Sequence, residues 1–234
     1  MSRPVAAPGP AGPRWSRWVG RFLARVVWDT RVVGSEHVPA TGPVILAANH
    51  LGVIDGPLVH GVVPRGTHIL VKEEMFHGPV GLVLRAAGQI PVDRTGGRPA
   101  LAAALAVLRR GGAVGIFPEG NRGRGDASTA RAGVAWLAVN SGAPVVPVAV
   151  LGTRRTGESV GHVPGFRRRL HVELGPPVVV ERPAGASGRA AVAHATDVLR
   201  AALSAHVQAV SARTGFALPD DVDRPPTGGR EPLA

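Results

Sequence analysis

The segment that decides the fold runs from residue 44 to residue 63 and reads VILAANHLGVIDGPLVHGVV. Its first residues, Val44–Ala47, are all apolar, which is typical of a strand buried on both faces of a parallel sheet. The later part, Gly56–Val63, is predicted to be a helix. His50 and Asp55 stand between the two, where α/β folds hold their functional residues. The segment therefore predicts an α/β fold with a site directly after the strand Val44–Ala47.

Short β-branched runs alternate with Ala- and Leu-rich segments along the rest of the chain, which predicts a single α/β domain. We expect a mostly parallel, mixed central sheet flanked by helices. The candidate strands are Arg31–Gly34, Val44–Ala47, His68–Val71, Gln89–Val92, Ala113–Phe117, Val145–Val150, Leu170–Leu174 and Val178–Val180. The candidate helices are Arg14–Trp28, Gly56–Val63, Pro79–Ala87, Pro99–Arg110, Thr129–Ser141 and Gly188–Thr214.

The domain is expected to cover residues 31–218, preceded by an amphipathic interfacial helix at 14–30. Residues 1–13 are rich in Pro, Ala and Gly, and residues 219–234 are rich in Pro and Asp, so both are expected to be disordered. No apolar run approaches the ~18 to 20 residues that cross a bilayer as a helix.

The charge of the chain indicates an anionic partner. Lys and Arg number 27 against 16 Asp and Glu, a net charge of +11. Nucleic acid, an anionic membrane surface and phosphorylated or CoA-like ligands all fit this balance. Lys72 is the only lysine, and a coding bias toward Arg is an alternative origin of that ratio. The absence of Cys excludes disulfides, thiolate metal sites and a cysteine nucleophile.

The first predicted helix is amphipathic, with cationic and apolar side chains on different faces. At about 100° per residue, one stripe holds Arg14, Arg17, Arg21 and Arg25, and the adjacent face holds Trp15, Val19, Phe22 and Val26. Such a helix can lie in the plane of a membrane with its Arg residues on anionic lipid. The alternative is that the apolar face packs on the domain and the Arg stripe is solvated.

His50 and Asp55 are the first candidates for chemistry. They are five positions apart, so only a turn, and not a regular helix, brings them together. Gly52 supplies the backbone freedom for that turn. In contact, the carboxylate would fix the imidazole tautomer while the other ring nitrogen takes a proton from a hydroxyl. The alternative is a helix-capping Asp55 and an unrelated loop His50.

A second candidate loop follows the predicted strand Ala113–Phe117 and runs to Gly125. Its three glycines and two arginines, FPEGNRGRG, outline an anion cradle, although a flexible solvated turn is the alternative. Arg94 follows another strand end. Three strand ends thus carry His, Asp and Arg groups, which indicates acyl or phosphoryl transfer on a phosphorylated substrate.

The motifs from about Gly34 to Gly152 resemble those of 1-acylglycerol-3-phosphate acyltransferases and related glycerolipid acyltransferases, which share an NHx4D motif. The four matching blocks are Asn49-His50 to Asp55, Lys72-Glu73 through Gly88 with Asp93-Arg94, Phe117 to Gly120 with Arg122, and Pro144 to Val148. Asn121 and the Leu51-Gly52 pair depart from the family pattern, which leaves the choice of acceptor open.

The resemblance implies that His50 is a general base and Asp55 its partner. It places the acceptor's glycerol phosphate on Arg94, Glu119, Gly120, Asn121 and Arg122, with Asn49, Lys72 and Pro147 as supporting residues. Backbone N–H groups near His50 or in the Gly-rich loop are the expected donors to the oxyanion.

The implied reaction moves a fatty acyl group from acyl-CoA or acyl carrier protein to a lysophospholipid. The expected acceptor is 1-acyl-sn-glycerol 3-phosphate, which gives phosphatidic acid. Glycerol 3-phosphate or another lysolipid are the alternatives. No cofactor beyond the acyl co-substrate is expected. The protein is expected to be peripheral, on anionic lipid at the cytoplasmic face of the cell membrane, without a nucleic-acid partner.

Two other function classes are weaker. Gly157–Gly161 formally matches GxSxG, but Pro164 breaks the helix that a serine hydrolase needs after its nucleophile. A nucleic-acid-binding protein would account for the charge, yet no matching motif is present. The nine His residues lack metal-ligand spacing, and His60, His68, His77 and His162 are expected to be surface or capping residues. The remaining arginines, Arg154, Arg155, Arg167, Arg168 and Arg169, form either a basic rim for anionic partners or a solvated loop.

Overall fold

The computed structural model describes residues 5–93, 97–120, 124–127, 131–182 and 184–221. Within these residues a sheet of seven strands has the order β1-β7-β6-β2-β5-β3-β4. The strands are β1 (Asp29–Val33), β2 (Val44–Ala48), β3 (Thr67–Lys72), β4 (Ile90–Val92), β5 (Ala113–Ile116), β6 (Val145–Leu151) and β7 (Arg169–Leu174). Only β6 and β7 pair antiparallel. The predicted mixed, mostly parallel sheet is confirmed.

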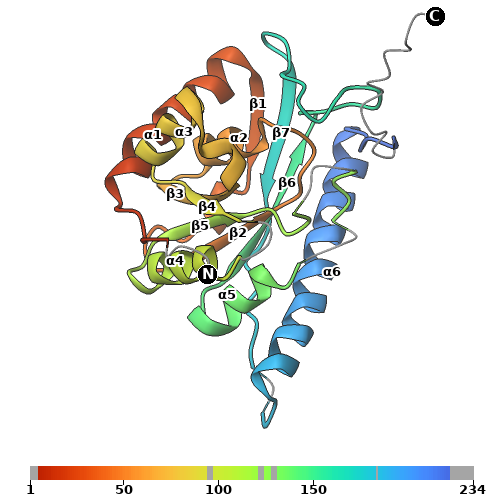
Figure 1. The fold of residues 1–234 in the computed structure, drawn as a ribbon. Helices are drawn as coiled ribbons and strands as arrows, with labels where there is room; N and C mark the ends of the chain where they lie inside the picture. The colour runs from red at the N-terminus through yellow and green to blue at the C-terminus, as the bar shows by residue number, and fades with distance from the viewer. Residues whose placement is uncertain (1–4, 94–96, 121–123, 128–130, 183, 222–234) are drawn as a thin grey trace, which may run out of the picture.

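Helices cover both faces of this sheet (Figure 1). The α-helices are α1 (Ala11–Phe22), α2 (Asp55–Val62), α3 (Gly78–Ala86), α4 (Arg98–Arg109), α5 (Gly133–Ser141) and α6 (Gly188–Thr214). A π-helical turn, η1 (Leu23–Val27), continues α1, and the 3-10 turns are η2 (Ser35–His37) and η3 (Glu73–Phe76). The predicted bounds of α6 are correct.

Strand β2 shows why the sheet is buried on both sides. Its alternate side chains Ile45 and Ala47 belong to the core under α4, α5 and α6. Val44, Leu46 and Ala48 belong to the opposite core, under η1 and α2. Successive side chains of a strand point to opposite faces of the sheet, so a continuous apolar run contributes to the core on both faces. The carboxyl end of this strand leads directly to His50.

The predicted strand Val178–Val180 is wrong. Val178 makes a single antiparallel bridge to Val145, with N–O distances of 2.7 and 2.9 Å in the two directions. Pro176 and Pro177 precede it, and neither has an N–H to give to a sheet ladder.

The expected arm and tail at the two ends need new boundaries. Helix α1 begins at Ala11, three residues before the expected Arg14, and Val5 packs against the core. At the other end, Asp220 accepts a hydrogen bond from Thr156, and Asp221 accepts one from Arg154. The ordered chain thus extends beyond the expected range at both ends. Helix α5 begins at Gly133, and its expected start, Thr129, lies outside the described residues.

Helix α1 packs through its small residues. Ser16 and Gly20 are buried against α2, where a Cβ on Gly20 would lie 2.7 Å from the Gly61 Cα atom. The aromatic side chains point elsewhere, because Trp15, Trp18 and Phe22 are 46%, 60% and 56% exposed. The alternative that the apolar face of this helix packs on the domain is therefore wrong.

Candidate active site

The turn between β2 and α2 brings His50 and Asp55 into contact. His50 Nδ1 lies 2.8 Å from Asp55 Oδ2, and the same oxygen accepts the backbone N–H groups of Leu51 at 2.6 Å and Gly52 at 2.8 Å. Asp55 is fully buried, while the His50 side chain is 12% exposed. Because a carboxylate oxygen can only accept, Nδ1 carries the hydrogen and Nε2 keeps its lone pair. The unrelated-loop interpretation of His50 is wrong.

Asn49 fixes the position of this turn. Its Nδ2 donates to the carbonyls of Gly125 and Val150, both at 3.1 Å, and its Oδ1 accepts the Val150 N–H at 2.7 Å. The side chain thus pairs with β6 as a strand backbone would. Asn49 therefore supports the site by holding the turn in place, since its side chain is buried in the protein interior.

The backbone N–H groups of the turn are already occupied. Besides the two that Asp55 accepts, Asn49 donates to Val148 O at 3.4 Å and Val53 to Val160 O at 3.0 Å. His50 N donates to Glu119 Oε1 at 3.1 Å. The N–H groups from 49 to 53 thus all have partners within the chain, and the other expected donors, in the Gly-rich loop, lie partly outside the described residues.

Glu119 was expected to touch the acceptor, but its Oε1 holds the backbone of His50. Burial raises the pKa of this carboxyl to about 7, and the negative charges of Asp126 and Asp55 add to the rise. The N–H of His50 acts in the opposite direction, because it favours the ionised form. Glu119 therefore links the end of β5 to the turn that carries the imidazole.

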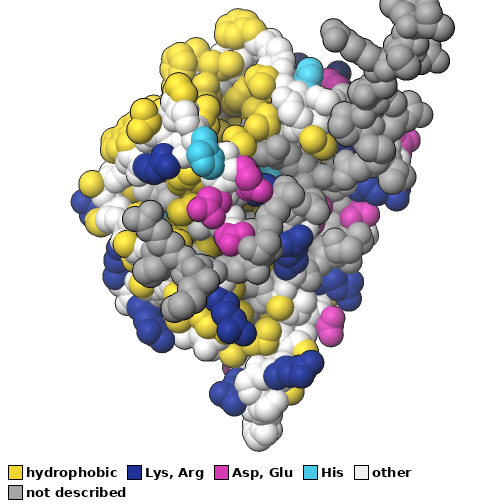
Figure 2. Space-filling model, viewed as in Figure 1, with side chains coloured by type: hydrophobic (Ala, Val, Ile, Leu, Met, Phe, Trp, Pro, Cys, Tyr) yellow, Lys and Arg dark blue, Asp and Glu magenta, His cyan; other side chains and the backbone are white. Residues whose placement is uncertain are grey.

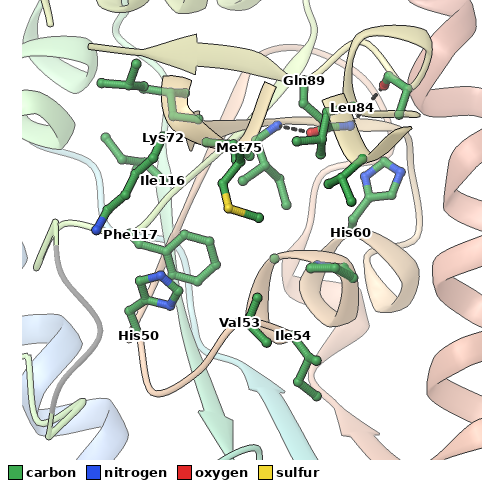
Figure 3. Close-up of a pocket in the computed structure, with 18 of the residues that line it drawn as sticks. His50, Val53, Ile54, His60, Lys72, Met75, Leu84, Gln89, Ile116 and Phe117 are labelled. Carbon is green, nitrogen blue, oxygen red and sulfur yellow. Dashed lines mark hydrogen bonds between the residues drawn. The ribbon is translucent and has the colours of Figure 1, made fainter. Parts of the chain in front are cut away.

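A cavity of about 700 Å³ opens beside His50 at the carboxyl ends of β2, β3, β4 and β5. Its volume is that of a typical ligand site. Figure 3 shows His50, Phe117 and Lys72 on one side of it and His60 and Leu84 on the other. The rings of Phe117 and His50 stack with their centroids 4.3 Å apart. The cavity thus has one polar end and a long apolar wall formed by α1, α2 and α3.

The other predicted site residues divide into three groups. Gly120, with a φ of +70°, and Lys72 line the cavity. Pro147 is buried inside the sheet opposite Ala47, in a part of β6 that does not line the cavity. Arg94, Asn121 and Arg122 lie outside the described residues.

The structure adds residues that sequence reasoning missed. Arg131 lines the cavity near Gly120. Ser16 Oγ and His60 Nε2, 2.8 Å apart, join α1 to α2 in the wall. Burial lowers the pKa of His60 to about 4, so this ring stays neutral near pH 7. His60 and His68 are buried, which corrects the expectation that they are surface or capping residues. Spacing alone gives no signal that separates these residues from other Arg or His.

The loop arginines are partly neutralised within the chain. Arg154 pairs with Asp221 at 2.9 Å, and Arg168 donates to both Glu158 carboxylate oxygens at 2.7 and 3.0 Å. Arg154 and Arg168, two of the five arginines of the expected basic rim, are therefore each paired with an acidic side chain. The GxSxG match lies in the same loop, where turns and not a helix follow Ser159.

Two kinds of feature are absent from the described residues. None of their helices is both long and apolar enough to span a bilayer. No three of their His, Asp or Glu side chains come together as a metal site would require.

Comparison with known proteins assigns the family. The Acyltransferase family model matches residues 29–151, more than half of the chain and the part that carries the His50 turn and the cavity loops. The chain belongs to the Acyltransferase family. This family segment includes β1 to β6 and every helix between them.

Named relatives of this acyltransferase-family chain are similar over about half of its length. It is 35% identical over 127 residues to a 1-acyl-sn-glycerol-3-phosphate acyltransferase of Borreliella burgdorferi, covering 52% of this chain and 51% of the relative. It is 33% identical over 125 residues to the Bacillus subtilis protein of that name, covering 52% and 62%. The match thus spans between half and two thirds of these relatives.

The crystal structure of the 1-acyl-sn-glycerophosphate acyltransferase PlsC from Thermotoga maritima has the same fold. It superposes with a TM-score of 0.62 at 25% sequence identity, over 85% of this chain and 79% of that one.

Proposed function

We propose that this protein transfers a fatty acyl group from an acyl thioester to the free hydroxyl of 1-acyl-sn-glycerol 3-phosphate, giving phosphatidic acid. The observation that carries the proposal is the hydrogen bond of 2.8 Å between His50 and a fully buried Asp55 at the polar end of an apolar cavity. The names of the relatives agree with this reaction.

In the proposed mechanism, His50 Nε2 takes the proton of the acceptor hydroxyl as the oxygen attacks the thioester carbonyl. Asp55 keeps Nδ1 protonated and stabilises the imidazolium that forms. The intermediate then collapses, the C–S bond breaks, and the thiolate takes the proton back from His50. The products are an ester and a free thiol, so no external oxidant or reductant is required.

The cavity wall suits an acyl chain. Its apolar side chains include Leu23, Val71, Met75, Leu84 and Val92, from η1, η3, α3 and the ends of β3 and β4. Burying one CH₂ group contributes about 0.8 kcal/mol, so a long chain in this cavity would supply much of the binding free energy. Acyl-CoA and acyl carrier protein remain alternative donors, and glycerol 3-phosphate or another lysolipid remain alternative acceptors.

We further propose that the protein works at an anionic membrane surface. Large apolar side chains are exposed on α1, η1, α3 and the loop before β7, and we call this set the apolar face: Trp15, Trp18, Val19, Phe22, Val26, Val80, Leu82, Val83, Val163 and Phe166. Figure 2 shows hydrophobic side chains gathered over α1 and α3. Monomeric soluble proteins rarely expose so many large apolar residues together.

Two further features support membrane contact. The guanidinium groups of Arg17 and Arg21 lie over the exposed Trp18 ring, 5.2 and 5.6 Å from its centroid, where they can meet anionic lipid headgroups. Trp15, Val19, Val80, Val83 and Val163 belong to both the apolar face and the cavity wall. A lysolipid could therefore pass from the bilayer to His50 without its chain entering water.

The reaction is tested with purified protein, isotopically labelled acyl-CoA or acyl carrier protein, and a panel of acceptors in detergent micelles. The panel holds 1-oleoylglycerol 3-phosphate, glycerol 3-phosphate, 1-oleoylglycerol and a lysophosphatidylcholine, and products are read by mass spectrometry. We expect labelled phosphatidic acid. Release of labelled fatty acid alone, or transfer only to an acceptor without a phosphate monoester, would contradict the proposal.

A further inference from the structure

Arg131 lies where the loop after β5 returns to the cavity. Its N–H donates to Pro118 O at 2.9 Å, which fixes its backbone beside the end of β5. Its side chain folds over Gly120, and a Cβ on that glycine would lie 2.8 Å from the Arg131 Cζ atom. A side chain at position 120 would therefore displace the guanidinium.

Among the described residues, Arg131 is one of two cations, with Lys72, that line the cavity. Lys72 and Asp93 also line the cavity, and their charges are of opposite sign. The Asp55 carboxylate is bonded to His50. Among the described residues, the guanidinium of Arg131 has no hydrogen-bond or ion-pair partner, unlike those of Arg168 and Arg213. A cation that faces a cavity and is not bonded to an acid of the chain is a candidate ligand for an anion.

Neighbouring backbone donors cannot take that place. Gly120 N donates to Phe117 O at 3.1 Å, and the N–H groups from 49 to 53 are also occupied. These described backbone N–H groups are therefore not available to an anion, and a side-chain donor is needed in their place. A guanidinium offers two parallel N–H groups to one phosphate, which an ammonium group cannot do.

We propose that Arg131 binds the phosphate monoester of the acceptor and makes the enzyme prefer phosphorylated acceptors over neutral ones. The proposal rests on the proposed function, and it adds a residue that determines specificity.

Steady-state kinetics on the full-length protein test this role. The variants are Arg131→Ala and Arg131→Lys, with Arg189→Ala as the matched control, because Arg189 is an exposed Arg at the start of α6 outside the cavity. Hydrogen bonds to a charged group are lost in Arg131→Ala, so KM for 1-oleoylglycerol 3-phosphate should rise about 10- to 100-fold, with kcat changed only a few-fold. Arg131→Lys should recover part of the loss, and Arg189→Ala should match the wild type.

The neutral acceptor 1-oleoylglycerol separates charge recognition from damage to the fold. Its KM should be the same in the wild type and in Arg131→Ala, and circular dichroism should show the same secondary structure in all variants. An unchanged KM for the phosphorylated acceptor in Arg131→Ala would overturn the proposal. An equal rise for both acceptors would also overturn it, because that pattern indicates a structural role.

Direct binding distinguishes this proposal from the proposed function. Calorimetry without an acyl donor should show that wild type binds 1-oleoylglycerol 3-phosphate at least tenfold more tightly than 1-oleoylglycerol, and that Arg131→Ala loses this difference. If that result appears and no acyl transfer occurs, the proposed function fails and the role of Arg131 stands. If the two proteins bind the phosphorylated lipid equally, the role of Arg131 fails whatever the activity.

Discussion

At the scale of single residues, one oxygen of Asp55 both shapes the turn and orients the His50 imidazole. It closes the turn through Leu51 and Gly52 and holds Nδ1 of His50. The tight turn follows from these bonds, because three donors converge on one buried acceptor. Removing the carboxylate would therefore disturb both the conformation of the turn and the orientation of the His50 ring.

Replacing Asp55 with Asn is expected to lower kcat by about 10²- to 10⁴-fold, the usual contribution of a general base. In the place of Oδ2, the amide oxygen of Asn can keep all three bonds, but it carries no negative charge. The imidazolium that forms when His50 takes a proton would then lose the negative charge that stabilises it. Initial rates of phosphatidic acid formation check this, and a loss smaller than threefold would contradict it.

Glu119 gives a pH dependence whose sign follows from its raised pKa. The carboxyl has a pKa of 4.5 in the unfolded chain and of about 7 in the folded one. The folded protein binds this proton more tightly, so the stability from this group is full below pH 4.5 and is lost as pH rises through 7. The loss amounts to about 3 kcal/mol.

The Glu119→Gln variant does not ionise, and its oxygen can still accept the His50 N–H. Its free energy of unfolding relative to wild type should therefore rise between pH 5 and pH 8. Urea unfolding at both pH values measures this, with Glu181→Gln, at an exposed position, as the control. The prediction fails if the Glu119→Gln difference is the same at both pH values.

How far residues could be predicted depended on local spacing. His50 and Asp55 are five positions apart around a glycine, so their contact could be predicted from the turn that it needs. Glu119 contacts the backbone of His50, which is 69 positions away in the sequence. Arg131 contacts Gly120, at the other end of the loop that follows β5. Such contacts depend on the conformation of the loops, and no local sequence pattern predicts that conformation.

At the scale of elements, α1 is held by close backbone contact and not by its aromatic residues. Gly20 meets Gly61 of α2, and Ser16 bonds to His60. Amphipathic periodicity predicted the helix correctly but could not say which face would be buried. The small residues Ser16 and Gly20 were the available signal, because close helix packing requires them.

Gly20→Ala should separate α1 from α2. The added Cβ would lie 2.7 Å from Gly61 Cα and 2.8 Å from Pro57 O, closer than atoms can approach. Overpacking of this kind costs about 1–3 kcal/mol, which thermal unfolding should show as a lower Tm. Gly188→Ala is the control, because a Cβ there meets no atom within 4 Å. An unchanged Tm in Gly20→Ala would contradict the packing described.

The sheet was predictable because its strands are apolar runs separated by helices. Buried parallel strands have this sequence pattern whatever the order in which they pair. The pairing order itself has no local signature, since β7 lies between β1 and β6 only in the folded chain. Val178–Val180 has the composition of a strand, but its flanking prolines prevent a ladder.

At the scale of the whole molecule, the apolar face and the cavity form one continuous surface. Flotation with vesicles tests the proposed membrane contact. Wild type should float with vesicles that contain phosphatidylglycerol and less with pure phosphatidylcholine. Phe22→Glu and Leu82→Glu should each lower the bound fraction, because each side chain would otherwise contribute about 1.5–3 kcal/mol on burial.

Val179→Glu is the matched control for that experiment. Val179 is 65% exposed, close to Leu82 at 69%, but it lies outside the apolar face. The membrane proposal fails if Val179→Glu reduces binding as much as the other two variants do, or if none of the three variants changes it.

The central claim is that His50, oriented by Asp55, takes the proton of the acceptor hydroxyl during acyl transfer. The most direct test is the rate at which His50→Ala forms phosphatidic acid from acyl-CoA and 1-oleoylglycerol 3-phosphate, with folding checked by circular dichroism. The account predicts a folded protein with at least 10²-fold less activity than wild type. A folded His50→Ala protein with wild-type turnover would contradict it.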